Sequence, residues 1–168
     1  LAGKESATLF MLMFAAFAVL LSRYTSEKDI VIGTSIDGRS NSDLEGVIGF
    51  FLNTIAVRCR LDGDPSFAEL LERVKESLLG GFAHQELPFE MLVDDLQPDR
   101  ELSRTPLVQV MLDWQQEGGE DLSIPGLQTT GPDFISQESA KFDLTLTALV
   151  DGNKLEIGFE YRDQKSVV

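Results

Sequence analysis

The chain has 168 residues, enough for one ordinary domain, and its 43% hydrophobic and 25% charged residues are typical of a globular fold. Its 28 acidic and 14 basic residues give a formal charge of −14, which argues against binding to nucleic acid or to an anionic membrane. A single cysteine and a single histidine exclude a disulfide framework and a Cys- or His-rich metal centre, so we expect no metal site.

The first predicted element is a helix over Leu9 to Leu21, the most apolar stretch of the chain. It is too short to cross a bilayer, which needs roughly 20 residues. It also lacks the basic flank and the cleavage site of a signal peptide. We therefore expect a helix that is buried nearly all round, with Ser6 or Thr8 near its start and Ser22–Arg23 at its polar end. The first residue is Leu1 and not Met, which indicates a piece of a longer protein.

Two strands are predicted next. The β-branched run Asp29–Gly33 indicates a short strand, and the polar stretch from Thr34 to Glu45 indicates a loop. The segment from Phe50 to Leu61 then alternates between apolar and polar residues, which predicts a strand with one buried face. The residues expected on that buried face are Ile55, Val57, Cys59 and Leu61.

A turn at residues 62–65 leads into a second helix, with Asp64 as the expected N-cap and Pro65 at the first helical position. This helix covers residues 66–85 and has apolar residues at amphipathic spacing, namely Phe67, Leu70, Leu71, Val74, Leu78 and Leu79. A short third helix is predicted from Pro88 to near Leu96.

The last third of the chain reads mainly as strands. Residues 107–114 predict a strand, 115–121 an acidic loop and 122–138 an extended segment. Residues 142–148 and 155–161 alternate on either side of an Asp-Gly-Asn turn, which predicts a hairpin whose apolar face is buried. Helices combined with strands that bury one face indicate an α/β fold of the two-layer α+β sandwich type, a mixed sheet packed against helices.

The residues by themselves show no convincing catalytic constellation. His84 sits at a predicted helix end, where capping or a backbone hydrogen bond explains it better than general-base catalysis. No G-x-S-x-G motif marks a nucleophilic serine, and Cys59 is expected to be a buried, inert thiol. Asp62 and Asp64 fit a turn better than a calcium loop, and Asp94–Asp95 fits a solvated helix end better than a catalytic pair.

Three segments, taken in order, resemble the later core motifs of condensation domains from nonribosomal peptide synthetases. They are residues 48–54 (IGFFLNT), 84–90 (HQELPFE) and 100–107 (RELSRTPL). Residues 20–25, 29–34, 38–39 and 140–145 look like the same family, so that the resemblance covers nearly the whole chain. Small departures are Leu52 for the usual Val, Glu86 for Asp and Thr105 for Asn.

The resemblance implies one chloramphenicol-acetyltransferase-like lobe, the C-terminal lobe of a condensation domain, over residues 1–168. The family's catalytic signature, two histidines followed three residues later by Asp-Gly, belongs to the N-terminal lobe and is absent here. We also expect the family's final helix to be missing after Tyr161. The fragment alone is therefore expected to be inactive as an acyltransferase.

For the complete domain, the resemblance implies peptide bond formation in secondary metabolite biosynthesis. A donor peptidyl or aminoacyl thioester and an acceptor aminoacyl thioester would enter on the phosphopantetheine arms of two carrier proteins, with no cofactor bound directly. Expected partners are the donor and acceptor peptidyl carrier proteins, the missing N-terminal lobe and an adjacent adenylation domain. The expected location is cytoplasmic.

The resemblance also suggests roles for particular residues. The candidates for lining the substrate tunnel are Thr34, Asn53, Thr54, Trp114 and Gln115. A loop-fixing role for Asn53 and a core-edge role for Trp114 stay open. The motif residues expected to be structural are His84, Gln85, Pro88, Phe89, Glu90, Arg100, Ser103, Arg104 and Pro106. Residues 34–46 would form the floor of the tunnel, and residues 127–139 a latch onto the other lobe that is disordered, folded back or exchanged without it.

Two other functions remain open at this point. The chain is also compatible with an epimerisation domain or a coenzyme-A acyltransferase of the same superfamily, although the HQELPFE and RELSRTPL segments favour condensation. The other alternative is a non-catalytic lobe that docks carrier proteins through a local apolar patch.

Overall fold

The computed structural model describes residues 1–39, 42–44, 46–97, 105–116 and 140–162 of the chain. Its elements, in chain order, are α1 (Leu9–Thr25), β1 (Asp29–Asp37), the short 3-10 helix η1 (Ser42–Leu44), β2 (Leu52–Arg60), α2 (Phe67–Ala83), α3 (Phe89–Leu96), β3 (Val110–Gln116), β4 (Leu144–Asp151) and β5 (Lys154–Tyr161).

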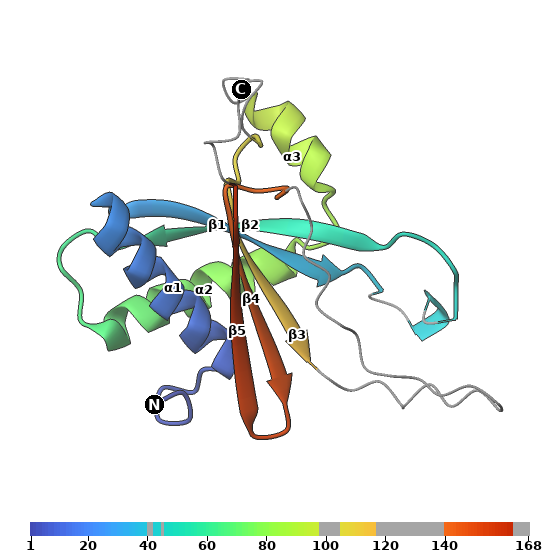
Figure 1. The fold of residues 1–168 in the computed structure, drawn as a ribbon. Helices are drawn as coiled ribbons and strands as arrows, with labels where there is room; N and C mark the ends of the chain where they lie inside the picture. The colour runs from blue at the N-terminus through green and yellow to red at the C-terminus, as the bar shows by residue number, and fades with distance from the viewer. Residues whose placement is uncertain (40–41, 45, 98–104, 117–139, 163–168) are drawn as a thin grey trace.

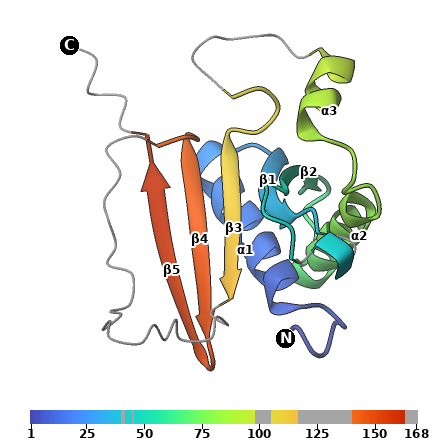
Figure 2. The same cartoon turned by 90° about the vertical axis from the view of Figure 1, so that its right-hand side faces the viewer.

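The five strands form one mixed sheet in the order β2-β1-β3-β4-β5. The chain makes antiparallel pairs of β1 with β2 and of β4 with β5, whereas β1 with β3 and β3 with β4 are parallel. The helices α1 and α2 lie together against one side of this strongly twisted sheet, and α3 lies on the other side of β1 and β2 (Figures 1 and 2). The predicted two-layer α/β sandwich with a mixed sheet is confirmed.

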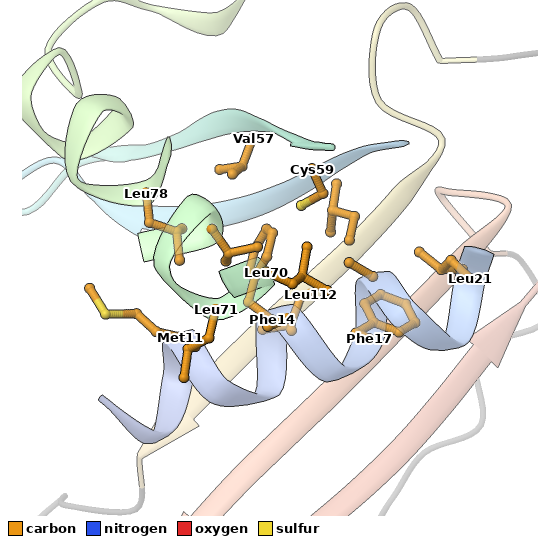
Figure 3. Packing of buried hydrophobic residues seen from close by; sticks show 14 of the residues in the cluster. Met11, Phe14, Phe17, Leu21, Val57, Cys59, Leu70, Leu71, Leu78 and Leu112 are labelled. Carbon is orange, nitrogen blue, oxygen red and sulfur yellow. The ribbon is translucent and has the colours of Figure 1, made fainter. Parts of the chain in front are cut away.

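The core lies between the sheet and the pair α1 and α2. Phe14 and Phe17 of α1 and Leu70 of α2 are almost fully buried against strand residues such as Leu112 of β3 (Figure 3). Burying a side chain of this size contributes roughly 1.5–3 kcal/mol. Most of the buried hydrophobic residues in the described part of the chain belong to this layer. The alternation predicted around β2 is confirmed, because Val57 and Cys59 both belong to this core.

Helix boundaries differ from the prediction at two places. α1 runs to Thr25 and is not buried nearly all round, because Leu9 and Leu20 are exposed on the side away from the sheet. α2 begins after Ser66 and not after Asp64, since Ser66 and Glu69 form a reciprocal capping box in which each side chain accepts from the other's backbone N–H. Asp64 instead takes a positive φ of 51° in the preceding turn.

Strand β1 is longer than predicted and includes residues that the sequence assigned to a loop. Residues 34–37 continue the strand because each pairs with a residue of β2, from Thr34 opposite Ile55 to Asp37 opposite Leu52. Thr34 also pairs with Leu112 of β3, so backbone groups on both sides of β1 are satisfied there. Polar composition alone therefore placed the strand end too early.

Two strands in the C-terminal part also differ from expectation. β3 starts at Val110 and not at residue 107, because Leu107 has a φ of 62° and the N–H of Val108 bonds to the carbonyl of Pro106. The predicted hairpin is present, but the apolar face of β5 is exposed: Phe159 reaches Phe17 of α1 and is still 52% exposed. β5 is an edge strand, and among the described elements neither α1 nor α2 extends over it. Leu79 of α2, predicted to be in the core, is likewise exposed.

Candidate functional site

One face of the sheet is free of α1 and α2, and we call it the open face. Side chains alternate along each strand, so the residues opposite one another in the register share a face. Val31, Gly33 and Ser35 of β1 therefore face the same way as Thr54, Ala56 and Arg58 of β2, Met111, Asp113 and Gln115 of β3, and Thr145, Thr147 and Leu149 of β4. The core residues of the strands occupy the alternate positions, and their side chains point towards the helices.

A row of polar side chains crosses the middle of the open face. Thr54 of β2 pairs with Ser35 of β1, and Asp113 of β3 pairs with Thr147 of β4. Ser35 and Asp113 join the two halves of the row, because the Ser35 hydroxyl donates a hydrogen bond of 2.6 Å to the Asp113 carboxylate. Gln115 donates a second bond, of 2.8 Å, to the other carboxylate oxygen. We call Thr54, Ser35, Asp113 and Thr147 the polar row.

The five predicted tunnel residues do not gather at one place. Thr54 and Gln115 lie on the open face, Thr54 within the polar row. Thr34 is only 1% exposed, and its side chain lies on the same face of the sheet as Ile32 and Ile55, the face that the helices cover. Trp114 also faces the helices, where its ring meets Phe10 of α1 edge-on at 5.7 Å between ring centroids.

Asn53, the fifth residue, fastens the connection between α2 and α3 to the start of β2. Its Nδ2 donates to the carbonyls of Gln85 and Leu87 at 2.9 and 2.8 Å. Its Oδ1 accepts from the N–H groups of Thr54 and Phe89 at 2.9 and 3.1 Å. α3 has Pro88 at its N-cap and no side-chain cap of its own, so Asn53 supplies the capping acceptor from another element. This is the loop-fixing role that the sequence left open.

The motif that contains His84 serves as a connection between helices. His84 is the C-cap residue of α2, with its backbone N–H bonded to the carbonyls of Gly81 and Phe82 and its own carbonyl accepting from Leu87. Its side chain is exposed. Glu90 lies in the first turn of α3, where its charge suits the helix N-terminus. Arg100, Ser103 and Arg104 and the predicted latch at 127–139 lie outside the described residues.

A hollow of about 360 Å³ lies where α3 stands over the open face. Thr54 lines it together with Phe89 and Val93 of α3 and with Val108 and Phe142 from the segments that lead into β3 and β4. Pro106 and Lys141 also border this hollow. The hollow begins at Thr54 of the polar row, and its lining is mainly apolar.

The turn that joins β1 to β2 carries an exposed apolar tip. Arg39 holds the turn, because its Nη1 donates to the carbonyls of Leu44 and Val47 and its guanidinium lies 4.3 Å from the ring centre of Phe51. Ile48 and Phe50, by contrast, are fully or almost fully exposed. The predicted floor loop of residues 34–46 is thus a strand followed by this fastened turn, as far as the structure describes it.

The other candidate groups offer little chemistry. Burial raises the pKa of the Cys59 thiol to about 12, so it stays protonated, as predicted for an inert thiol. Within the described residues, no group of three or more His, Cys, Asp or Glu side chains is arranged to hold a metal ion. The described helices also include none with the length and apolarity required to cross a membrane.

Ser35 and Asp113 were not among the residues predicted for the site. Asp113 is the one charged residue in the run VQVMLDW, and a lone charge within a predicted strand is a usable signal. Ser35 lies in the polar stretch that the sequence predicts to be a loop, whereas in the structure it continues the alternation of Val31 and Gly33 along β1.

Comparison with known proteins identifies the relatives of this chain. The family model described as the condensation domain matches residues 1–165. A linear gramicidin synthase subunit of Brevibacillus parabrevis is 48% identical over 162 residues, which is 96% of this chain and 3% of that protein. Malpinin synthetase of Mortierella alpina is 43% identical over 161 residues, 96% of this chain and 2% of that protein. The chain thus spans a small part of these curated relatives.

Solved structures give the same answer for the fold. The crystal structure of the X-domain from teicoplanin biosynthesis is 32% identical with a TM-score of 0.85, covering 95% of this chain and 37% of that one. A four-domain nonribosomal peptide synthetase bound to AMP and glycine is 30% identical with a TM-score of 0.82, covering 94% of this chain and 13% of that one. The expected chloramphenicol-acetyltransferase-like fold is thereby confirmed.

Proposed function

Because the chain belongs to the condensation-domain family, we propose that it is the C-terminal lobe of a condensation domain that forms amide bonds in a nonribosomal peptide synthetase. The observation that carries this proposal is the family match over residues 1–165, supported by the 48% identity to a linear gramicidin synthase. The 37% coverage of the X-domain chain supports the assignment to one lobe of a larger domain.

The reaction joins two carrier-bound substrates. The amine nitrogen of the acceptor attacks the thioester carbonyl of the donor. The new C–N bond forms, the C–S bond breaks, the amine loses a proton, and the donor's phosphopantetheine thiol is released. Holding two tethered reactants in attack geometry accounts for much of the acceleration, and stabilisation of the tetrahedral intermediate accounts for more. The described residues hold no paired-histidine signature, so we assign such a group to the other lobe.

In this proposal the open face forms one wall of the substrate tunnel. The face is free of α1 and α2, it is crossed by the polar row, and it is hollowed beside α3. Thr54 and Gln115 would contact substrate, while Thr34, Asn53 and Trp114 support the wall from behind or from its edge. The exposed Ile48 and Phe50 suit burial against the N-terminal lobe, because large apolar side chains are rarely left in water together.

The partners that we propose are the donor and acceptor carrier proteins, with their phosphopantetheine arms, the N-terminal lobe and an adenylation domain. The similarity to a four-domain synthetase supports a multidomain setting.

A second candidate is a lobe that binds a partner protein without catalysing condensation. The specific observation in its favour is the similarity to the X-domain from teicoplanin biosynthesis, which has also been solved in complex with OxyB. That complex is 34% identical to this chain with a TM-score of 0.77 and covers 88% of it.

An exchange of the lobe between enzymes tests the proposal. This chain replaces the matching segment of the linear gramicidin synthase to which it is 48% identical, and the chimaera is supplied with loaded donor and acceptor carrier proteins. We expect the amide product by mass spectrometry and no product from the 168-residue chain alone. A chimaera that folds and binds both carriers without forming amide would favour the partner-binding function.

A further inference from the structure

Asp113 is a carboxylate in the centre of the open face whose partners are neutral. Ser35 donates to Oδ1 and Gln115 donates to Oδ2, at 2.6 and 2.8 Å. Across the described ranges, no lysine, arginine or histidine forms an ion pair with Asp113. Its side chain is half-buried, so the charge is partly withdrawn from water, and no cation among the described residues balances it.

The surroundings orient this carboxylate. Ser35 holds one oxygen from β1, and Gln115 holds the other from two residues further along β3. Thr147 stands opposite Asp113 on β4, so hydroxyl groups flank the carboxylate on both neighbouring strands. An ionised carboxylate has about four acceptor positions, and the two described bonds leave room for another donor from the open side.

Within the part of the chain that the structure describes, a cationic donor is the partner that this arrangement lacks. Charge-assisted hydrogen bonds are about twice as strong as those between neutral groups, and they gain further where water is partly excluded. In the reaction proposed above, the acceptor must bring a free α-amine, which has a pKa of roughly 8 and is mostly an ammonium ion at neutral pH. A peptidyl donor has its amine already acylated and brings no such charge, so the ammonium group distinguishes the acceptor from a peptidyl donor but not from an aminoacyl donor.

We propose that Asp113, oriented by Ser35 and Gln115, binds the ammonium group of the acceptor aminoacyl thioester at the open face. This inference rests on the proposed amide-forming function and names the residue that recognises its acceptor. Asp113 holds the amine before it loses its proton, so its contribution is to the binding of the acceptor and not to the chemical step.

The experiment compares the binding of two acceptor mimics to the complete condensation domain that carries this lobe. The first is an aminoacyl pantetheine with an amide in place of the thioester, and the second is the same molecule with its amine acetylated. Titration calorimetry gives the ratio of the two dissociation constants for the wild type. Because a charge-assisted bond to a partly exposed group is worth about tenfold in affinity, we expect about a tenfold preference for the free amine.

Three variants make the test specific. Asp113→Asn keeps the shape and loses the charge, so the preference should fall to about one, whereas Asp113→Glu should retain part of it. Ser35→Ala should reduce the preference by less than Asp113→Asn does. Asp29→Asn is the matched control, because Asp29 lies on the same face six residues before Ser35, about 20 Å along the strand, and should keep the full preference.

The outcomes separate this inference from the function on which it rests. Equal binding of the two mimics by the wild type, or equal losses in Asp113→Asn and Asp29→Asn, would overturn the role of Asp113. The role of Asp113 would also be overturned if Asp113→Asn kept the full preference for the free amine while its circular dichroism matched that of the wild type. Amide formation by the wild type is measured separately, and its absence would count against the proposed function while the binding ratio still decides the role of Asp113.

Discussion

Replacement of Asn53 by alanine should detach α3 from the sheet. The side chain forms four hydrogen bonds, to the backbone of Thr54, Gln85, Leu87 and Phe89. Each bond contributes about 0.5–1.5 kcal/mol net, and the freed groups are near enough to solvent to bond water instead. The lower part of that range gives a loss of about 2–3 kcal/mol in the free energy of unfolding. That figure includes the capping bond to the first residue of α3, worth about 1 kcal/mol.

Two measurements on this chain check the expectation. Urea unfolding followed by circular dichroism gives the change in stability, and hydrogen exchange reports the N–H of Phe89 and the rest of α3. Asn53→Asp keeps the acceptor oxygen and loses the donor, so it should preserve the protection of Phe89 that Asn53→Ala removes. Asn153→Ala, in the exposed turn between β4 and β5, is the control and should change neither quantity. A loss below about 0.5 kcal/mol for Asn53→Ala, with Phe89 still protected, would refute the reasoning.

Other substitutions test the packing, the capping and the buried thiol. Gly33→Ala should lower the free energy of unfolding by about 1–3 kcal/mol, because the added Cβ would clash with Met111. Gly80→Ala, whose added Cβ meets no atom within 4 Å, should raise the free energy of unfolding by up to about 1 kcal/mol. Thermal melts that show equal stability for the two variants would contradict this. Ser66→Ala removes the capping box and should lower stability by about 1 kcal/mol in urea, and an unchanged midpoint would argue against it. Cys59 has its pKa raised by burial from an ordinary 9.0 to about 12, so the stability that it confers is complete below pH 9 and is lost as the pH rises towards 12. A thiol reagent should therefore modify Cys59 only after denaturation, and rapid labelling of the folded chain at about pH 8 would show the thiol to be accessible.

Much of the fold could be predicted because the signals are local. The β4–β5 hairpin follows from alternation on either side of Asp-Gly-Asn, and α3 follows from Pro88 and the apolar spacing behind it. Errors occurred where a distant contact decided the outcome. The end of β1 was misplaced because its pairing partners lie in β2 and β3. The face of β5 was expected to be buried, but alternation reports which side a residue faces and not whether another element covers that side.

The same division applies to the candidate site. The motifs in residues 48–54, 84–90 and 100–107, taken in order with their flanking segments, predicted the family, and the sequence itself contained the lone acidic residue of β3. Only the tertiary structure placed Ser35 beside Asp113, because the two are 78 positions apart and meet through a parallel pairing of β1 with β3. The tertiary structure also placed Thr54 and Gln115 on the open face and Thr34 and Trp114 on the face covered by the helices. The register between neighbouring strands decides which side chains of a strand point to each face. Periodicity is a property of one segment, whereas a site depends on which segments the core brings together.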